Sequence, residues 1–540
     1  MTIVSEFSPH RRALLLGGAA LTGLAACKPK GPTNEAGGPV AKTKAGSVRG
    51  RTEDGVYTFK GVRYGATTAG RRFQPPLPPA PWTDVQPALD YGSSSPQIAA
   101  GNGGGLYASW INLRPQSEDC LFLNVWTKGL ADGKKRPVMV WFHGGGYATG
   151  SGSSKGYDGV RLANRGDVVL VTVNHRLNVF GYTYLGDIGG AAYADSGNAG
   201  NLDMIQSLEW VRDNIEEFGG DPGKVTIFGE SGGGGKVSTL LAMPKAAGLF
   251  HRAIVQSGST LSVRTTDAAT AASKSLLGAC GVKTADDLAA LPVEKLLAAI
   301  TPAKAPAGEP TPPPPVPTPG PTMDGRQLPR QPFAPDAPAT AKDVPMLIGT
   351  CKDEQAGLMG ARDPKTFDLT WDDLPGRLSA LADRGLDPVK AIAATRALYP
   401  DANAGYVFFI INTEMGMRHN AILQAERKAA QSGAPAFMYM LAHETPVDGG
   451  KWHSPHAYDL VFMFDNVAKS ASFVGDDKDA QKVADAMSTA WIKFARDGNP
   501  GWDSYSAEHR AVMVFDTASK VVVDPRSQER ILYSNLKDPA

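Results

Sequence analysis

The residues whose types and spacing could perform chemistry gather around Ser231. It stands in the middle of residues 229–233, GESGG, which form a G-x-S-x-G motif. A β-branched and aromatic run at 225–228 is typical of a buried strand, and residues 236–241 are typical of a helix. On such a strand-to-helix turn the glycines leave room for a tight backbone, and the serine hydroxyl stands clear of the sheet. The motif therefore predicts that Ser231 is a nucleophile, with an ordinary glycine-rich turn as the alternative.

A serine hydroxyl attacks well only when a neighbouring imidazole accepts its proton. Of the nine histidines, most lie in the N-terminal signal, beside a glycine run, or in strand, helix or tail contexts without special surroundings. Three remain, His443, His453 and His456, and all follow Ser231, the chain order expected for a base that serves this kind of turn. Spacing alone does not separate His456 from His453.

The imidazole needs a carboxylate that orients the ring and stabilises its charged form. This acid should follow a strand that lies between the serine and the histidine in the chain. Residues 344–349, VPMLIG, form such an apolar strand, and Asp353 and Glu354 come shortly after it. Either carboxylate could serve on this reasoning, and a solvated pair of surface acids is the alternative.

A third requirement is a set of backbone N–H groups that stabilises the oxyanion formed when a serine attacks a carbonyl carbon. The apolar run 137–142, PVMVWF, ends in His143 and the glycines Gly144 to Gly146. A glycine loop of this kind after a buried strand is typical of an oxyanion hole. Together these residues predict acyl transfer through a serine ester.

The elements that must position these residues alternate between strands and helices. Continuous apolar runs predict strands covered on both faces, and periodic segments predict helices between them. The predicted strands are 137–142, 167–174, 225–228, 344–349 and 436–441, and the predicted helices include 198–218, 375–398, 420–432 and 484–495. A hairpin turn at Asp54-Gly55 precedes them. This order favours an α/β fold with a mostly parallel sheet.

Composition excludes some classes of partner. With 55 lysines and arginines against 54 acidic residues, the chain has no charge bias that would suggest a nucleic acid or an anionic membrane surface. Cys120, Cys280 and Cys351 show no spacing typical of a metal site. Residues 302–321 are rich in proline and predict a surface loop.

The first 26 residues predict an export signal. Arg11-Arg12 precede an apolar stretch, 13–26, that is too short to span a bilayer and resembles a twin-arginine signal. Residues 24–27 resemble the lipobox of bacterial lipoproteins, in which Cys27 would be lipidated; cleavage with an incidental Cys27 is the alternative. Residues 27–45 predict a flexible tether. We therefore expect an exported protein that is periplasmic or anchored in a membrane, or secreted if Cys27 carries no lipid.

Several stretches of the chain together resemble the type-B carboxylesterases, the α/β-hydrolases that include the cholinesterases. They are SEDCLFLNVW, PVMVWFHGGGYATGSG, VTVNHRLNVFGY, GNLDMIQSLEWVRDNIEEFGGDPGKVTIFGESGGG, LIGTCKDEQAG, SPHAYDLVFMF and WIKFARDGNP. The resemblance implies a single α/β-hydrolase domain over residues 46–540, with helical excursions over an active-site gorge. It also implies an enzyme that hydrolyses carboxylic esters through an acyl-enzyme intermediate, without a metal or a cofactor.

The same resemblance implies roles for individual residues. Ser231 would be the nucleophile, Glu354 the acid and His456, within SPHAYDL, the base. The backbone donors of the oxyanion hole would be Gly145, Gly146 and Gly232. The family usually has alanine at the last of these positions, and a backbone donor is unaffected by that difference.

Two pocket residues and one cysteine also follow from the resemblance. Trp110 has the spacing of the cation-binding tryptophan of cholinesterases, and an aromatic wall of an ordinary hydrophobic pocket is the alternative. Glu230 would make the pocket mildly anionic. The family often forms a disulfide to Cys120 from the position that Ser95 occupies here, so Cys120 is predicted to be an unpaired, buried thiol.

The resemblance limits the substrate only to a broad class. For bacterial members it implies small-molecule esters of the xenobiotic or natural-product type, such as drug, pesticide or mycotoxin side-chain esters. Carbamates, amides and thioesters are the near alternatives, because the same triad could attack them. An inactive cholinesterase-like binding protein is the remote alternative. A monomer or weak oligomer is expected.

Overall fold

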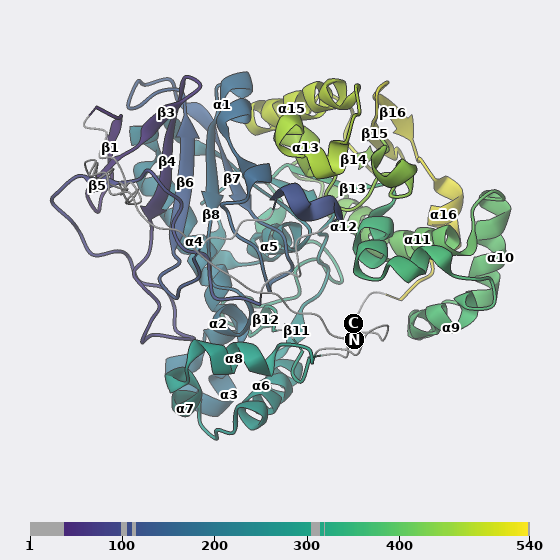
Figure 1. Cartoon of the computed structure of the whole chain (residues 1–540), viewed down its shortest axis with the longest axis horizontal. Coiled ribbons are helices and arrows are strands. Elements are labelled where there is room, and N and C mark those ends of the chain that lie inside the picture. Colours follow the sequence, from purple (N-terminus) through teal and green to yellow (C-terminus); the bar gives the residue numbers. More distant parts are fainter. Residues whose placement is uncertain (1–36, 99–104, 111–114, 304–313, 318, 538–540) are drawn as a thin grey trace, which may run out of the picture. The chain divides into compact units, whose positions relative to one another are not determined.

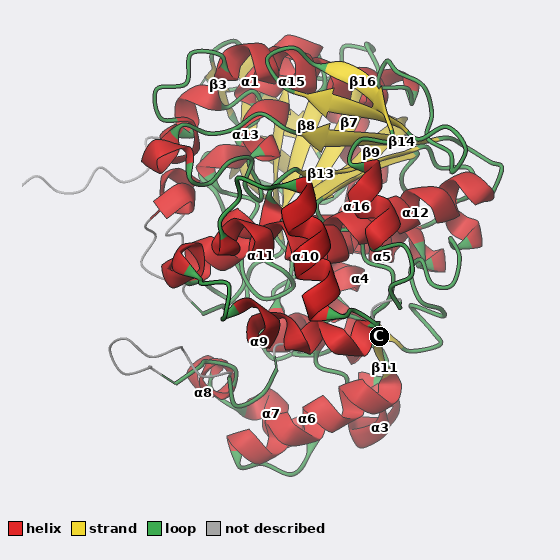
Figure 2. Ribbon diagram, turned by 90° about the vertical axis from the view of Figure 1, so that its right-hand side faces the viewer, coloured by secondary structure: helices red, strands yellow, loops and turns green. Residues whose placement is uncertain are grey.

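The computed structural model describes residues 37–98, 105–110, 115–303, 314–317 and 319–537. The predicted export signal, Cys27 and the middle of the proline-rich segment lie outside the described residues. Figure 1 and Figure 2 show the body from residue 38 onward as a central sheet with helices on both of its faces.

A large sheet runs through this body, with its strands in the order β16-β15-β14-β13-β10-β9-β7-β8-β6-β4-β3. The strands from β15 to β8 in this order are parallel to one another, and antiparallel strands complete both edges. The prediction of a mostly parallel sheet is therefore confirmed. The strands are β3 (Arg51–Glu53), β4 (Val56–Arg63), β6 (Phe122–Thr127), β7 (Arg136–Phe142), β8 (Val169–Val173), β9 (Gly220–Glu230), β10 (Arg252–Gln256), β13 (Met346–Cys351), β14 (Ala436–Leu441), β15 (Ala511–Phe515) and β16 (Lys520–Val523).

The folded body begins earlier than the sequence predicted. Short strands outside the large sheet are β1 (Val40–Lys42), β2 (Ser47–Arg49), β5 (Gln86–Pro87), β11 (Arg264–Thr265) and β12 (Thr322–Met323). β1 pairs antiparallel with β2, and the side chain of Ala41 is buried in the core. The predicted tether, 27–45, is therefore wrong at its C-terminal end. A strand with one buried side chain carries too little periodicity to be found in a sequence.

The central strands explain the two layers of helices. β7 and β8 are buried along their whole length, as continuous apolar runs predict for strands covered on both faces. Alternate side chains of β7 enter different core clusters, Val140 on one face of the sheet and Trp141 on the other. The first face is covered by α4 (Ala199–Asn214), α5 (Gly232–Leu241) and α12 (His419–Ala430), and the second by α1 (Val160–Gly166), α13 (Asp459–Met463) and α15 (Ala480–Asp497). The predicted helices 198–218, 420–432 and 484–495 are thus confirmed, the first ending in a 3₁₀ turn at Ile215–Phe218.

Two groups of helices form apolar clusters of their own beside the sheet (Figure 1). The first consists of α6 (Thr266–Cys280), α7 (Ala285–Ala290) and α8 (Val293–Ala299), and the second of α9 (Leu374–Leu378), α10 (Pro388–Leu398) and α11 (Ala404–Thr413), with α16 (Ser527–Leu532) against α10. The remaining short helices are α2 (Asn178–Tyr182), α3 (Gly186–Gly189) and α14 (Ala471–Val474). Among the described residues, no helix is long and apolar enough to cross a membrane.

The proline-rich segment is not a surface loop throughout. Residues 304–313 lie outside the described residues, but Val316 is buried in the cluster formed by α6, α7 and α8. The prediction for 302–321 is therefore wrong for this end of the segment. Val316 is the one valine, leucine or isoleucine in the sequence of this segment, and its side chain is the one that packs in the cluster.

Candidate active site

Ser231 lies on the sharp turn between β9 and α5. Its backbone has φ 56° and ψ −124°, a conformation that is strained for a residue with a side chain. Its N–H donates to the carbonyl oxygen of Gln256 on the neighbouring strand β10 (2.8 Å), which holds the turn against the sheet. Ser231 lines a pocket of about 400 Å³. The predicted strand-turn-helix context of the motif is confirmed.

The glycines after Ser231 are explained by the close approach of the end of β7 and the loop that follows it. A Cβ at Gly232 would lie 2.1 Å from the carbonyl oxygen of Gly146, and a Cβ at Gly233 would lie 2.0 Å from that of Phe142. A larger residue at Gly232 would push the loop away from the serine, and one at Gly233 would push away the end of β7. Helix α5 begins inside the glycine run, at Gly232, and thus earlier than predicted. A glycine in a helix costs about 1 kcal/mol of helix stability relative to alanine. Here that cost allows the close contact described above.

His456 and Glu354 form a buried pair on the wall of this pocket. The imidazole Nδ1 lies 2.6 Å from Glu354 Oε2, and the two residues are 3% and 0% exposed. The second carboxylate oxygen accepts hydrogen bonds from the hydroxyl of Ser257 (2.6 Å) and from the backbone N–H of Cys351 (2.8 Å). Because both oxygens are engaged, the carboxylate can hold the ring in one orientation with Nδ1 protonated. Nε2 is then the basic atom of the ring.

Glu230 faces the other nitrogen of the same ring. Its Oε1 lies 3.1 Å from His456 Nε2. Burial raises the pKa of the Glu230 carboxyl. Burial by itself lowers the pKa of His456, but the charges of Glu230 and Glu354 outweigh it and raise that pKa above its ordinary value. Glu230 therefore contributes to the charge balance of the site as well as to the pocket wall.

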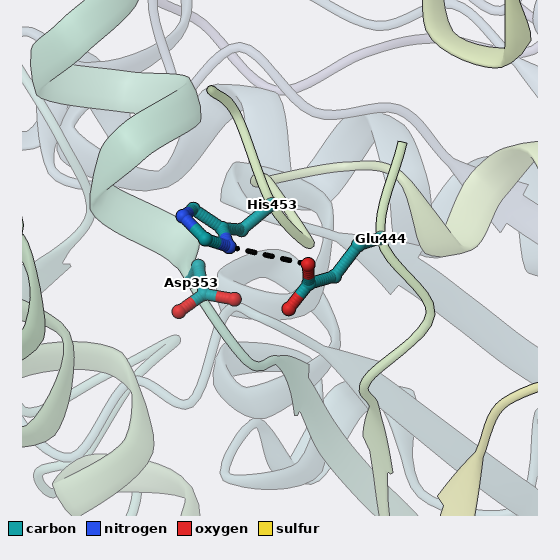
Figure 3. A group of neighbouring side chains, drawn as sticks. All are labelled: Asp353, Glu444 and His453. Atoms are coloured by element: carbon teal, nitrogen blue, oxygen red, sulfur yellow. Dashed lines mark ion pairs between the residues drawn. The ribbon is translucent and has the colours of Figure 1, made fainter. Parts of the chain in front are cut away.

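The other candidates for acid and base, Asp353 and His453, lie together in a separate cluster (Figure 3). His453 Nδ1 pairs with Glu444 Oε2 at 3.3 Å, and ligand atoms of these three residues lie within 4.8 Å of one another. The ammonium of Lys352 lies 2.8 Å from Glu444 and 3.7 Å from Asp353, so a cation of the chain already contacts both carboxylates of the cluster. Among the described residues that line the pocket of Ser231, neither Asp353 nor His453 appears.

The predicted oxyanion loop follows β7 and borders the pocket. Gly145 and Gly146 have φ angles of 87° and 64°, a region that glycine occupies without strain. Gly144 and Gly145 line the pocket together with Ser231. The structure thus brings the loop, the serine and the His456–Glu354 pair to one place.

A buried lysine beneath this loop was missed in the sequence. Lys236 on α5 is 0% exposed, and its Nζ donates to the carbonyl oxygen of His143 at 2.7 Å. Burial lowers the pKa of this ammonium to about 7. The bond holds the first residue of the loop to the helix that follows Ser231. The signal in the sequence was one charged side chain in a short helix of otherwise uncharged residues.

Aromatic side chains form much of the pocket wall, including Trp110, Tyr107 and Tyr157. Trp110 ends the 3₁₀ turn Gly105–Trp110, and its Nε1 donates to the hydroxyl of Ser470 at 3.0 Å. Its ring centroid lies 4.4 Å from that of Phe473, with a tilt of 30°. One face of the indole is therefore covered by Phe473, as suits a packed wall residue.

The environment of Cys120 agrees with the expectation of an unpaired thiol. In the part of the chain that the structure describes, Cys120, Cys280 and Cys351 are all free of disulfides. Cys120 is fully buried, burial raises the pKa of its thiol, and the hydroxyl of Ser95 lies in hydrogen-bond contact with it. Ser95 thus occupies the place beside Cys120 where the resemblance puts a second cysteine.

Comparison with known proteins identifies the group to which this fold and site belong. The family described as "Carboxylesterase family" matches residues 37–531. The chain belongs to the carboxylesterase family. It is 34% identical over 515 residues to the para-nitrobenzyl esterase of Bacillus subtilis (strain 168), a match that covers 91% of this chain and 97% of the relative. It is also 32% identical over 506 residues to the phenmedipham hydrolase of Pseudarthrobacter oxydans, with 90% and 97% covered.

Solved structures lead to the same family. A carboxylesterase of Geobacillus stearothermophilus is 37% identical, superposes with a TM-score of 0.78, and is matched over 92% of this chain and 99% of that one. A solved para-nitrobenzyl esterase has 30% identity and a TM-score of 0.74, with 93% and 99% covered. These likenesses and the mixed sheet with its flanking helices confirm the α/β-hydrolase fold and a carboxylic ester hydrolase.

Proposed function

We propose that this carboxylesterase works through an acyl-enzyme on Ser231, with His456 as the base and Glu354 as the acid. The observation that carries the proposal is the buried Glu354–His456 hydrogen bond of 2.6 Å. His456 lines the same pocket as Ser231, whose backbone is strained. A buried carboxylate on Nδ1 makes Nε2 the nitrogen that accepts a proton, and Glu230 Oε1, 3.1 Å from Nε2, stabilises the charged ring.

The steps follow from these positions. His456 Nε2 takes the hydroxyl proton of Ser231 as Oγ attacks the ester carbonyl carbon, and the oxyanion that forms accepts backbone hydrogen bonds from Gly145, Gly146 and Gly232. The C–O bond to the alcohol then breaks, and the alcohol leaves with the proton from His456. Water attacks the acyl-enzyme with the same base, the carboxylic acid is released, and Ser231 regains its proton.

Substitution of the serine tests the proposal directly. Ser231→Ala should abolish hydrolysis of a phenyl ester, because the residual catalysis of triad variants comes only from binding and the oxyanion hole. An organophosphonate probe should label the native protein at Ser231, as seen by peptide mass spectrometry. Labelling at another residue would contradict the assignment.

The range of bonds cleaved is a second part of the proposal. We propose small-molecule esters of the xenobiotic or natural-product type as substrates, with carbamates, amides and thioesters as the near alternatives. The names of the relatives, a para-nitrobenzyl esterase and a phenmedipham hydrolase, support activity on synthetic compounds. Hydrolysis rates for the ester, thioester, carbamate and amide of one acid would rank the alternatives.

We also propose that the protein is exported and attached to a membrane through lipidated Cys27. The support is the arginine pair, the short apolar stretch and the lipobox-like residues 24–27. The native protein should partition with membranes, and Cys27→Ala should release it or block its processing. A soluble native chain that begins at Cys27 without added mass would contradict this.

A further inference from the structure

Arg362 lines the pocket that holds Ser231 and His456, yet it has no part in the steps above. It is the one lysine or arginine among the described lining residues, which are otherwise mostly glycine, aromatic and aliphatic. Its side chain is exposed at the pocket, and within the described part of the chain it forms no ion pair or hydrogen bond. A guanidinium is always charged near neutral pH, so this pocket carries an unneutralised positive charge on its wall.

The backbone that carries Arg362 is held in place. The residue follows the π-helical turn Ala356–Gly360, just beyond the loop that carries Glu354. A Cβ at Gly357 would lie 2.7 Å from the backbone nitrogen of His456, and a Cβ at Gly360 would lie 2.6 Å from the ring of Phe367. Such close packing leaves the segment little room to move. The guanidinium is therefore presented from a fixed base, with freedom only in its own side chain.

The carboxylates near Arg362 are engaged elsewhere. Asp363, the next residue in the chain, pairs with Arg377 at 3.6 Å. Glu230 and Glu354 both face the imidazole of His456, at 3.1 and 2.6 Å. The positive charge of Arg362 thus has no internal counter-ion among the described residues, and it is available to an anionic group that enters the pocket.

We propose that Arg362 is the binding site for a carboxylate carried by the substrate, so that the preferred esters are anionic. The inference rests on the proposed function of the pocket and adds its substrate class. A planar guanidinium donates two parallel hydrogen bonds to a carboxylate, which is both strong and directional. The carboxylate can belong to the acyl part, as in a monoester of a dicarboxylic acid, or to the alcohol part, as in an ester of a hydroxy acid.

Matched substrates that differ only in charge test the proposal. For the acyl side, the phenyl monoester of glutaric acid is compared with its primary amide analogue; for the alcohol side, 3-acetoxybenzoate is compared with 3-acetoxybenzamide. The measured quantity is the ratio of kcat/KM for the acid to kcat/KM for the amide. Arg362→Gln should lower this ratio about fivefold to tenfold on one side at low salt, and by less at high salt, as expected for an ion pair that salt screens.

Three further variants test whether the change in the ratio comes from the charge at position 362. Arg362→Lys should retain part of the preference, and Arg362→Glu should reverse it. Arg396→Gln is the matched control, because it removes an exposed guanidinium that stacks on Trp371 and does not line the pocket. An unchanged ratio in Arg362→Gln on both sides would overturn the proposal. Hydrolysis of these esters that Ser231→Ala leaves unchanged would instead overturn the proposed function.

Discussion

Two pairs in this molecule each combine a carboxylate with a histidine, and the two pairs differ in burial. In the inner pair, Glu354 and His456 meet at 2.6 Å, and their side chains are 0% and 4% exposed. In the outer pair, Glu444 and His453 meet at 3.3 Å, with side chains 46% and 35% exposed. The outer histidine precedes the inner one by three residues in the chain, yet the two imidazoles lie in different surroundings.

The difference in exposure shows that burial decides how strongly a carboxylate and a histidine interact. Water screens the outer pair, and Lys352 shares the charge of Glu444, so neither partner depends on the other alone. The inner carboxylate is sealed from water, where an electrostatic interaction is stronger, and its second oxygen is held by Ser257 and the backbone of Cys351. Only the inner pair can both orient an imidazole and stabilise its charge during a reaction.

The largest effect that separates the pairs is expected from the two adjacent acids. Glu354→Gln keeps the size of the side chain but presents an amide to Nδ1, which favours the wrong tautomer of His456. We expect kcat to fall by about 10³–10⁴-fold with a modest change in KM. Asp353→Asn should cost far less, because Asp353 faces the outer pair. Steady-state kinetics of both purified variants is the measurement.

The opposite ranking of the two variants in kcat would contradict the assignment of Glu354 as the acid. If Asp353→Asn crippled kcat and Glu354→Gln stayed near the native value, the acid would be Asp353. A melting curve of each variant guards against loss of folding. Glu354→Asp should retain partial activity, since its charge survives at a greater distance from the ring.

A smaller effect is expected from Glu230, which lies beside Nε2 of His456 in the inner pair. Its charge raises the pKa of His456, and His456 must be neutral to accept the serine proton. Glu230→Gln removes that charge and so lowers the pKa of His456. The rising limb of the pH profile of kcat/KM should therefore move to lower pH, by about one unit. A limb that stays in place would show that Glu230 does not act on the base.

The sequence predicted those parts of the candidate active site that are marked by a contiguous motif. The motif around Ser231, the apolar strand β7 and the glycine loop after it are contiguous patterns, and the structure places them as expected. The choice of His456 over His453 was different, because exposure depends on segments far away in the chain. Residue patterns left both open, and only the resemblance favoured His456.

Residues that act through distant contacts escaped prediction. Lys236 binds a carbonyl 93 residues earlier in the chain, and Arg362 reaches the pocket from a segment with no marked pattern. The glycines after Ser231 could be noticed but not explained, since the loop that crowds them is itself placed by the sheet. The early start of the body at β1 was missed because pairing with β2, and not composition, orders those residues.

The smallest expected effect belongs to the outer pair. His453 has a φ of 51°, a region that asparagine tolerates, so His453→Asn removes the imidazole without added backbone strain. The contact with Glu444 raises the pKa of His453, and the contact with His453 lowers the pKa of Glu444 to about 2. A raised histidine pKa stabilises the fold below the unfolded value, about 6.5, and a lowered carboxyl pKa does so above about 4.5.

The contribution of the outer pair should therefore be greatest between about pH 4.5 and 6.5 and fade as pH rises through the folded pKa of His453. Because both side chains are partly exposed, we expect His453→Asn to cost only about 0.5 kcal/mol there, and less at 1 M salt. Thermal unfolding of the variant and the native protein at pH 5.5 and pH 8.5 measures this. A constant difference at both pH values would assign the loss to packing against Tyr406, whose ring lies 4.7 Å from that of His453, and not to the ion pair. The value of kcat should change little, since the outer pair lies outside the pocket; a large fall would make the two pairs one functional unit.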